Sequence, residues 1–235
     1  MSRRFQRFHF SRFQIAVHLG ALAPLVLLAW DLWQGQLSVN PIQDITFRTG
    51  KTAMALLVLT LTATPMNTMF GFKSGLKVRR ALGVYAFAYA LLHFLTYAWL
   101  DYSWDLTLIG LEIYEKPYVL VGFAAFLILI PLAVTSTKGW QRRLKKSWKT
   151  LHKWVYVAGV LVMLHYIWVQ KADIREPLLW TGGLILLLLL RLPQVRRQII
   201  AHRNRSRTMR SLSPPAHPSK IKGKIASSSK TSTPS

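Results

Sequence analysis

The sequence predicts an all-α membrane protein with six transmembrane helices. Of its 235 residues, 51% are hydrophobic and only 17% are charged, whereas charged residues make up about a quarter of an ordinary soluble domain. Several apolar runs approach the roughly 20 residues that a helix needs to cross a bilayer core. The charged residues between these runs also alternate in sign along the chain. Together these observations exclude a disordered chain, a coiled coil and an ordinary soluble enzyme.

Six apolar runs are expected to form the spans. They cover residues 14–33, 51–64, 82–100, 118–135, 151–169 and 177–192. The second is short for a span unless it begins near Phe47. We therefore divide the chain into a basic N-terminus (1–13), a transmembrane domain (14–193) and a basic tail (194–235). The tail is rich in Arg, Lys, Ser and Pro, which predicts disorder along an anionic membrane surface.

The distribution of charge predicts the topology. Most of the 31 lysines and arginines lie in residues 1–13, 66–81, 136–153 and 191–235, which hold no acidic residue. All eight acidic residues lie in the alternate segments. Cytoplasmic loops carry the excess of Lys and Arg, so both termini are expected in the cytoplasm. The net charge of +23 is then mainly a feature of topology, and we predict no nucleic-acid partner.

Three of the seven histidines, His93, His152 and His165, lie in or beside apolar runs. Ionisable groups at such depth are costly and tend to face the interior of a helix bundle. The third and fifth runs are both expected to cross the membrane from the cytoplasm outward. His93 follows Arg79 by about the same number of residues as His165 follows His152. At about 1.5 Å per residue, His93 and His165 should share an outer depth, and Arg79 and His152 an inner one.

Two imidazoles at one depth can supply both axial ligands of a haem iron. Hydrogen bonding between helices is the alternative interpretation of the same pair. Small residues nearby would leave room for a flat ring or allow close helix packing; they are Gly83, Ala86, Ala90, Ala158 and Gly159. The spacing between His152 and His165 does not place them on one face of a regular helix. Either the fifth helix is locally irregular, or the inner site is approached from a different side. The absence of cysteine excludes c-type haem and iron–sulfur clusters.

Four segments are similar to one known family. They read NPIQDITFRTG, RRALGVYAFAYALLHFLTYAWLD, KPYVLVGFAAFLILIPLAVTST and LHKWVY…LHYIW, within residues 40–171. The chain thereby resembles the MsrQ (YedZ) family, the haem-binding subunits of the periplasmic methionine sulfoxide reductase system in the bacterial inner membrane. The resemblance implies a ferric-reductase-like bundle with b-type haem between the third and fifth helices. His93, His165 and His152 match haem-ligating positions, but Arg79 occupies the fourth, which leaves open one haem or two.

The resemblance also implies an electron route. No GxGxxG nucleotide fingerprint occurs in the sequence, so electrons are expected from a membrane quinol or a separate cytoplasmic flavin reductase. The implied acceptor is MsrP, the periplasmic molybdopterin subunit that repairs oxidised envelope proteins. The family's use of FMN would suit the basic inner surface, although topology charges near lipid phosphates are the simpler interpretation of that cluster.

Other roles for these residues stay open. The acidic outer loop 101–116, with Tyr102, Trp104 and Tyr114, is either a partner dock or part of an aromatic belt. Further aromatic residues either line a haem or pack the bundle; they are Tyr85, Tyr89, Tyr97, Trp154 and Trp168. The alternative functions are a ferric reductase or another quinol-linked cytochrome b, and a non-redox transporter or assembly factor.

Overall fold

A computed structural model describes residues 11–170 and 173–201, and every regular element in these ranges is helical. The elements are α1 (Arg12–Trp33), α2 (Pro41–Phe70), α3 (Lys73–Leu95), the π-helix η1 (Thr96–Asp101), α4 (Leu106–Glu115), α5 (Pro117–Val134), α6 (Lys138–Leu151), α7 (Trp154–Val169) and α8 (Arg175–Leu189). Four spans, with α3 and η1 taken as one, are long and apolar enough to cross a membrane. The number is six when each of two bent helix pairs counts as one span. The prediction of an all-α, multi-pass membrane protein is confirmed.

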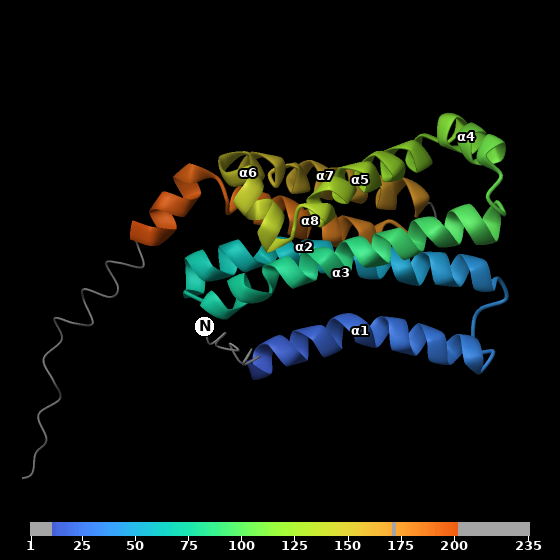
Figure 1. Ribbon diagram of the computed structural model, residues 1–235, viewed down its shortest axis with the longest axis horizontal. Helices are drawn as coiled ribbons and strands as arrows, with labels where there is room; N and C mark the ends of the chain where they lie inside the picture. The colour runs from blue at the N-terminus through green and yellow to red at the C-terminus, as the bar shows by residue number, and fades with distance from the viewer. Residues whose placement is uncertain (1–10, 171–172, 202–235) are drawn as a thin grey trace, which may run out of the picture.

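The long helices lie side by side along the bundle, and the short helices α4 and α6 lie at its opposite ends (Figure 1). The most extensive packing is between α2 and α3 and between α5 and α7. Helix α1 packs on α3 and α2, and α8 packs on α7 and α2. The pairs α2–α3 and α5–α7 therefore form the centre of the bundle, and they carry His93 and His165.

The centre of α2 is buried, although its sequence carries several threonines. Leu61 is completely buried, and Thr49 and Thr60 are nearly so. Each of these threonine hydroxyls donates to a backbone carbonyl one turn earlier, Thr49 to Ile45 at 2.7 Å and Thr60 to Leu56 at 2.9 Å. Because the helix itself satisfies these hydroxyls, α2 tolerates them in an apolar environment and continues well beyond the predicted residues 51–64.

Local signals define the ends of α2. Asn40 accepts a hydrogen bond from the Gln43 amide, and Pro41 occupies the first turn, where its missing N–H is not needed. At the other end Gly71 adopts φ 72°, the left-handed conformation that commonly ends a helix. These signals explain why α2 has 30 residues.

Two further boundaries differ from the sequence prediction. The fifth predicted span begins at Leu151, but the chain breaks there, and α6 and α7 are bent by 52° relative to each other. A helix also covers Pro193–Ala201, bent by 72° from α8, so helical structure extends past residue 193 into the predicted tail. The predictions for residues 1–10 and for the tail from 202 onward fall outside the described residues.

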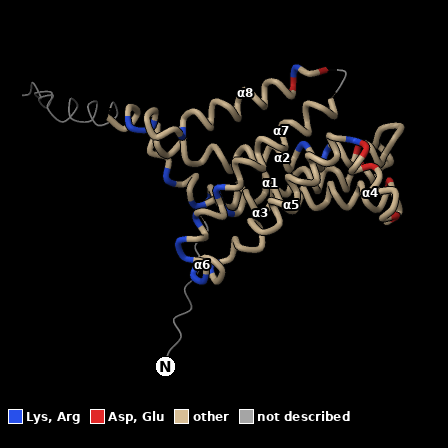
Figure 2. The backbone as a smooth tube through the Cα atoms, turned by 90° about the horizontal axis from the view of Figure 1, so that it is seen from above, with Lys and Arg blue, Asp and Glu red and all other residues tan. Residues whose placement is uncertain are grey.

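Charged residues are segregated along the bundle axis (Figure 2). Most of the described lysines and arginines lie at the end that carries α6, and the acidic residues lie at the end that carries α4. The described chain begins and ends near the α6 end. This arrangement agrees with the alternation of charge in the sequence.

Candidate functional site

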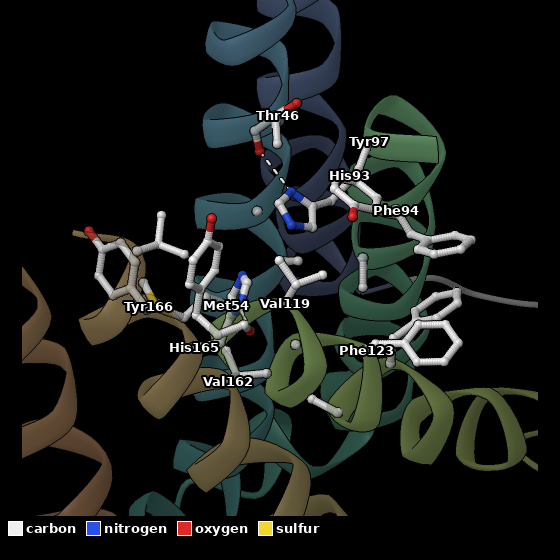
Figure 3. A pocket seen from close by; sticks show the side chains of 18 of the residues that line it. Thr46, Met54, His93, Phe94, Tyr97, Val119, Phe123, Val162, His165 and Tyr166 are labelled. Atoms are coloured by element: carbon white, nitrogen blue, oxygen red, sulfur yellow. Dashed lines mark hydrogen bonds between the residues drawn. The ribbon is translucent and has the colours of Figure 1, made fainter. Parts of the chain in front are cut away.

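A cavity of about 390 Å³ lies between α2, α3, α5 and α7. Both His93 and His165 line it (Figure 3). Its walls are mainly apolar and aromatic, with Met54, Phe94 and Phe123 among them. Concave, largely apolar cavities with a few convergent polar groups are the usual form of a cofactor site.

The two histidines are held in the same way on different helix pairs. His93 extends from α3, and its Nδ1 lies 2.9 Å from the carbonyl oxygen of Thr46 on α2. His165 extends from α7, and its Nδ1 lies 2.7 Å from the carbonyl oxygen of Tyr118 on α5. A carbonyl can only accept, so each Nδ1–H donates, which leaves the lone pair of a neutral ring on Nε2.

The predicted shared depth of His93 and His165 is what the structure shows. Their ring centroids are 6.2 Å apart, with an interplanar angle of 79°. Helix α3 brings one ring to the cavity and α7 brings the other. Two imidazoles with free Nε2 lone pairs can ligate one metal ion between them, and a carbonyl or carboxylate oxygen that accepts from Nδ1–H is the usual partner of a metal-bound histidine. The described residues contain no cluster of three or more His, Cys, Asp or Glu that could hold a metal ion.

Thr46 and Tyr118 were not predicted as site residues, because they act through backbone oxygens. The two acceptors share one sequence feature, because each lies 47 residues before its histidine. This repetition shows that the α2–α3 and α5–α7 pairs present their histidines by the same local construction.

The inner predicted residues, His152 and Arg79, do not line this cavity. The Thr135 hydroxyl donates to the Pro131 carbonyl at 2.6 Å and lies 3.1 Å from His152 Nε2. Its own hydrogen is thereby used, so His152 Nε2–H donates to it, and in this conformation Nε2 offers no lone pair. Arg79 donates to the Thr64 hydroxyl at 3.3 Å. His152 lies at the break between α6 and α7, so His152 and His165 do not belong to one regular helix.

Arg191, at the same end of the bundle as His152, connects three helices. Its guanidinium donates to the Leu61 carbonyl at 2.6 Å and to the Tyr156 hydroxyl, and it lies 4.9 Å from the centroid of the Tyr156 ring. Sequence reasoning treated Arg191 only as a topology charge. Its role as a contact between α8, α2 and α7 depends on packing that no local pattern reveals.

Polar residues in and beside α4 also line the cavity. Tyr102, Glu112 and Lys116 lie there, and Lys51 lines the cavity from α2. Lys116 pairs with Glu112, whose carboxylate raises the pKa of the Lys116 ammonium. Burial raises the pKa of the Tyr102 phenol. Lys51 pairs with Glu176 of α8 at 2.7 Å, so both lysines meet a carboxylate at the cavity rim.

The predicted small and aromatic residues divide into two groups. Ala86, Ala90 and Tyr97 line the cavity. The other small residues pack elsewhere, Gly83 near Thr60 and Gly159 near Leu61 and Leu184. The remaining aromatic residues face away from the cavity or bind another helix; they are Tyr85, Tyr89, Trp154 and Trp168.

This helical bundle, with a histidine-lined cavity between its central helix pairs, contains a ferric-reductase-like domain: residues 49–163 match the family described as "Ferric reductase like transmembrane component". Similarity to individual proteins extends further. The chain is 46% identical over 209 residues to the protein-methionine-sulfoxide reductase heme-binding subunit MsrQ of Xanthomonas campestris pv. campestris (strain 8004), which covers 86% of this chain and 94% of that protein. It is 44% identical over 187 residues to the MsrQ of Rhodospirillum rubrum, and that alignment covers 79% of this chain and 90% of the relative. The chain belongs to the MsrQ family.

Proposed function

We propose that this protein is the membrane electron-transfer subunit of a methionine sulfoxide reductase system and holds b-type haem between His93 and His165. The observation that carries the proposal is the matched pair of rings, 6.2 Å apart between centroids, each with Nδ1 bound to a backbone carbonyl. The relatives in Xanthomonas campestris and Rhodospirillum rubrum are named as heme-binding subunits, which supports it independently.

The donor set suits a haem. Neutral imidazole is a good iron ligand, and hydrogen bonding at Nδ1 fixes the tautomer and raises the basicity of the ligand. The apolar walls around the two rings exclude water, and burial of this kind is one of the factors that set a haem potential. When bound, the haem supplies a one-electron carrier, while the chain positions it.

The rim lysines would hold the acidic edge of the haem. Lys51 and Lys116 are the lysines that line the cavity, and the described residues place no arginine there. Their present partners are the carboxylates of Glu176 and Glu112. A haem carboxylate would be a chemically equivalent partner for either ammonium.

The segregated charges support the proposed orientation of the bundle in the membrane (Figure 2). In the proposed topology the basic α6 end faces the cytoplasm of a bacterial inner membrane, and the α4 end faces the periplasm. Electrons enter from a quinol or a cytoplasmic flavin reductase and leave near α4 to the molybdopterin subunit MsrP. Trp104 and Tyr114 are 50% and 86% exposed at that end, which suits a docking surface.

A second haem at His152 and Arg79 and a bound FMN are the finer elements of the proposal. His152 would have to release Thr135 to offer Nε2 to an iron. A flavin phosphate would meet the basic inner surface around Arg79 and Arg80. Haem and flavin per protein chain, measured after purification, test both elements directly.

The decisive experiment is a reduced-minus-oxidised optical spectrum of the detergent-purified protein, with haem quantitation, for the wild type and for His93→Ala, His165→Ala and His152→Ala. We expect a bis-histidine b-type spectrum that His93→Ala and His165→Ala each abolish. His18→Ala is the matched control, because it removes a partly buried histidine of α1 that is bound to Tyr85 rather than one that lines the cavity. A wild type that stays colourless after expression with ample haem would contradict the proposal and favour a transporter or assembly factor. Reduction of ferric chelates without reduction of MsrP would instead favour a ferric reductase.

A further inference from the structure

We propose that Gly50 and Gly122 are positioning residues for the two cavity histidines. Each glycine leaves open the one patch of helix surface on which the imidazole must lie to reach its carbonyl partner. The inference rests on the proposed haem site and assigns to it two glycines that line the cavity and lie against the rings of the proposed ligands.

The evidence is how closely each ring approaches its glycine. A Cβ added at Gly122 would lie 2.6 Å from His165 Nδ1 and 2.8 Å from its Cε1. A Cβ added at Gly50 would lie 3.0 Å from His93 Nδ1 and 3.1 Å from its Cε1. Contacts under about 3 Å require the ring to move, so any side chain at Gly122 displaces His165, and one at Gly50 crowds His93. No other glycine of the described chain meets a histidine in this way.

Helix geometry explains why glycine is needed at these two positions. Side chains of an α-helix lean toward its N-terminus, so a residue covers the surface over the turn that precedes it. Gly50 follows Thr46 by one turn, and Gly122 follows Tyr118 by one turn, so their Cβ atoms would cover the two accepting carbonyls. Each carbonyl has two lone pairs. A ring from another helix can reach the second lone pair only when the residue one turn after the acceptor has no side chain.

The arrangement occurs twice, on two different helix pairs. In both, the accepting residue lies 47 residues before the histidine, and the glycine lies one turn after the acceptor. The two histidines reach the cavity from opposite pairs, α2–α3 and α5–α7. Chance packing of one ring on one glycine would not reproduce the same contact at the second site.

The consequence concerns both the affinity and the potential of the haem. The Nδ1 hydrogen bond raises the basicity of the ligand and fixes the plane of the ring, and removal of such a partner typically weakens metal binding about 10–100-fold. A weaker donor favours ferrous over ferric iron, so loss of the bond raises the midpoint potential. The displacement is larger at Gly122 than at Gly50, and the effects should follow that order.

The experiment compares Gly122→Ala and Gly50→Ala with Gly183→Ala, a control in α8 where an added Cβ meets no atom within 4 Å. Haem per chain, the low-spin electron paramagnetic resonance signal and the midpoint potential are measured on full-length protein in detergent. We expect Gly122→Ala to lose most of its haem. We expect Gly50→Ala to keep more haem, with a shifted signal and a raised potential, and Gly183→Ala to match the wild type. Variants whose haem content, signal and potential equal those of the control would overturn the inference.

A second measurement separates positioning from general misfolding and does not require haem. Thermal unfolding of the haem-depleted full chain is compared for Gly122→Ala in the wild-type and in the His165→Ala background. We expect Gly122→Ala to lower the unfolding temperature in the wild type and to have little effect where the ring has been removed. Equal effects in both backgrounds would overturn the inference. A wild type without haem would identify the proposed function, rather than the glycine contact, as the failed step.

Discussion

Trp148 stacks on the imidazole of His152, with ring centroids 4.0 Å apart and an interplanar angle of 28°. Trp148 Nε1 also donates to the Thr135 carbonyl at 2.9 Å, while His152 donates to the Thr135 hydroxyl. Thr135, at the end of α5, is thus bound through both its backbone and its side chain to the break between α6 and α7. In this conformation His152 secures a helix junction.

Replacement of Thr135 by Val should weaken this junction. The change leaves the His152 Nε2–H without its acceptor, and an unsatisfied polar group in a partly buried position costs about 1–3 kcal/mol. We expect a lower free energy of unfolding in detergent but no change in the haem spectrum, because Thr135 does not line the His93–His165 cavity. Thr150→Val, at an exposed position of α6, is the control. Loss of the main haem signal in Thr135→Val would contradict the separation of the two sites.

Replacement of Tyr89 by Phe should loosen α1 from the bundle. The Tyr89 hydroxyl donates to the Ala21 carbonyl at 2.8 Å and accepts from the Leu25 amide at 3.0 Å, and thus binds α3 to the middle of α1. Both backbone groups lose a partner in the variant, so we expect a destabilisation of about 1–3 kcal/mol. Tyr114→Phe removes a hydroxyl from a side chain that is 86% exposed and should have no effect. Equal unfolding temperatures for the two variants would show that the bridge contributes little.

Replacement of Lys51 by Gln should lower the midpoint potential of the haem while leaving the free energy of unfolding almost unchanged. The Lys51–Glu176 pair is 43% and 44% exposed, and exposed pairs contribute only about 0–1 kcal/mol, so unfolding should barely change. Loss of a positive charge at the cavity rim stabilises ferric haem and should lower the midpoint potential. Lys73→Gln, at the first residue of α3 and outside the cavity lining, controls for net charge. A redox titration in which Lys51→Gln and Lys73→Gln behave alike would exclude a rim effect.

Replacement of Tyr114 by Ala together with Glu115 by Lys should slow electron delivery to MsrP if α4 is the dock. Both residues are exposed on α4, whereas Asp105 accepts hydrogen bonds from the first amides of that helix and Glu112 pairs with Lys116. Variants of those two acids would disturb the fold as well as the surface. We expect slower haem oxidation by MsrP, with a changed dependence on salt, and an unaltered haem spectrum. An unchanged rate, measured against Lys146→Glu on α6, would locate the dock elsewhere.

The sequence predicted the spans wherever apolar length alone decides, as for α1 and α5. It underestimated α2, because the helix satisfies its own threonine hydroxyls and is therefore more apolar in effect than its composition suggests. It raised an irregular fifth helix as one possibility but did not locate the break between α6 and α7, since residues 151–153 carry no proline or glycine. The depth of His93 and His165 followed from residue counting, because the rise of a helix is constant.

By itself, the sequence determined the membrane class, the segregation of charge and the two histidines that meet in the cavity. Hydrophobic length and axial spacing are one-dimensional properties, and a linear pattern records them directly. Only the tertiary structure decided which ring nitrogen is free, that His152 is held by Thr135, and that Gly50 and Gly122 admit the two rings. Those features depend on the rotation of one helix against another and on backbone carbonyls, which carry no side-chain signature.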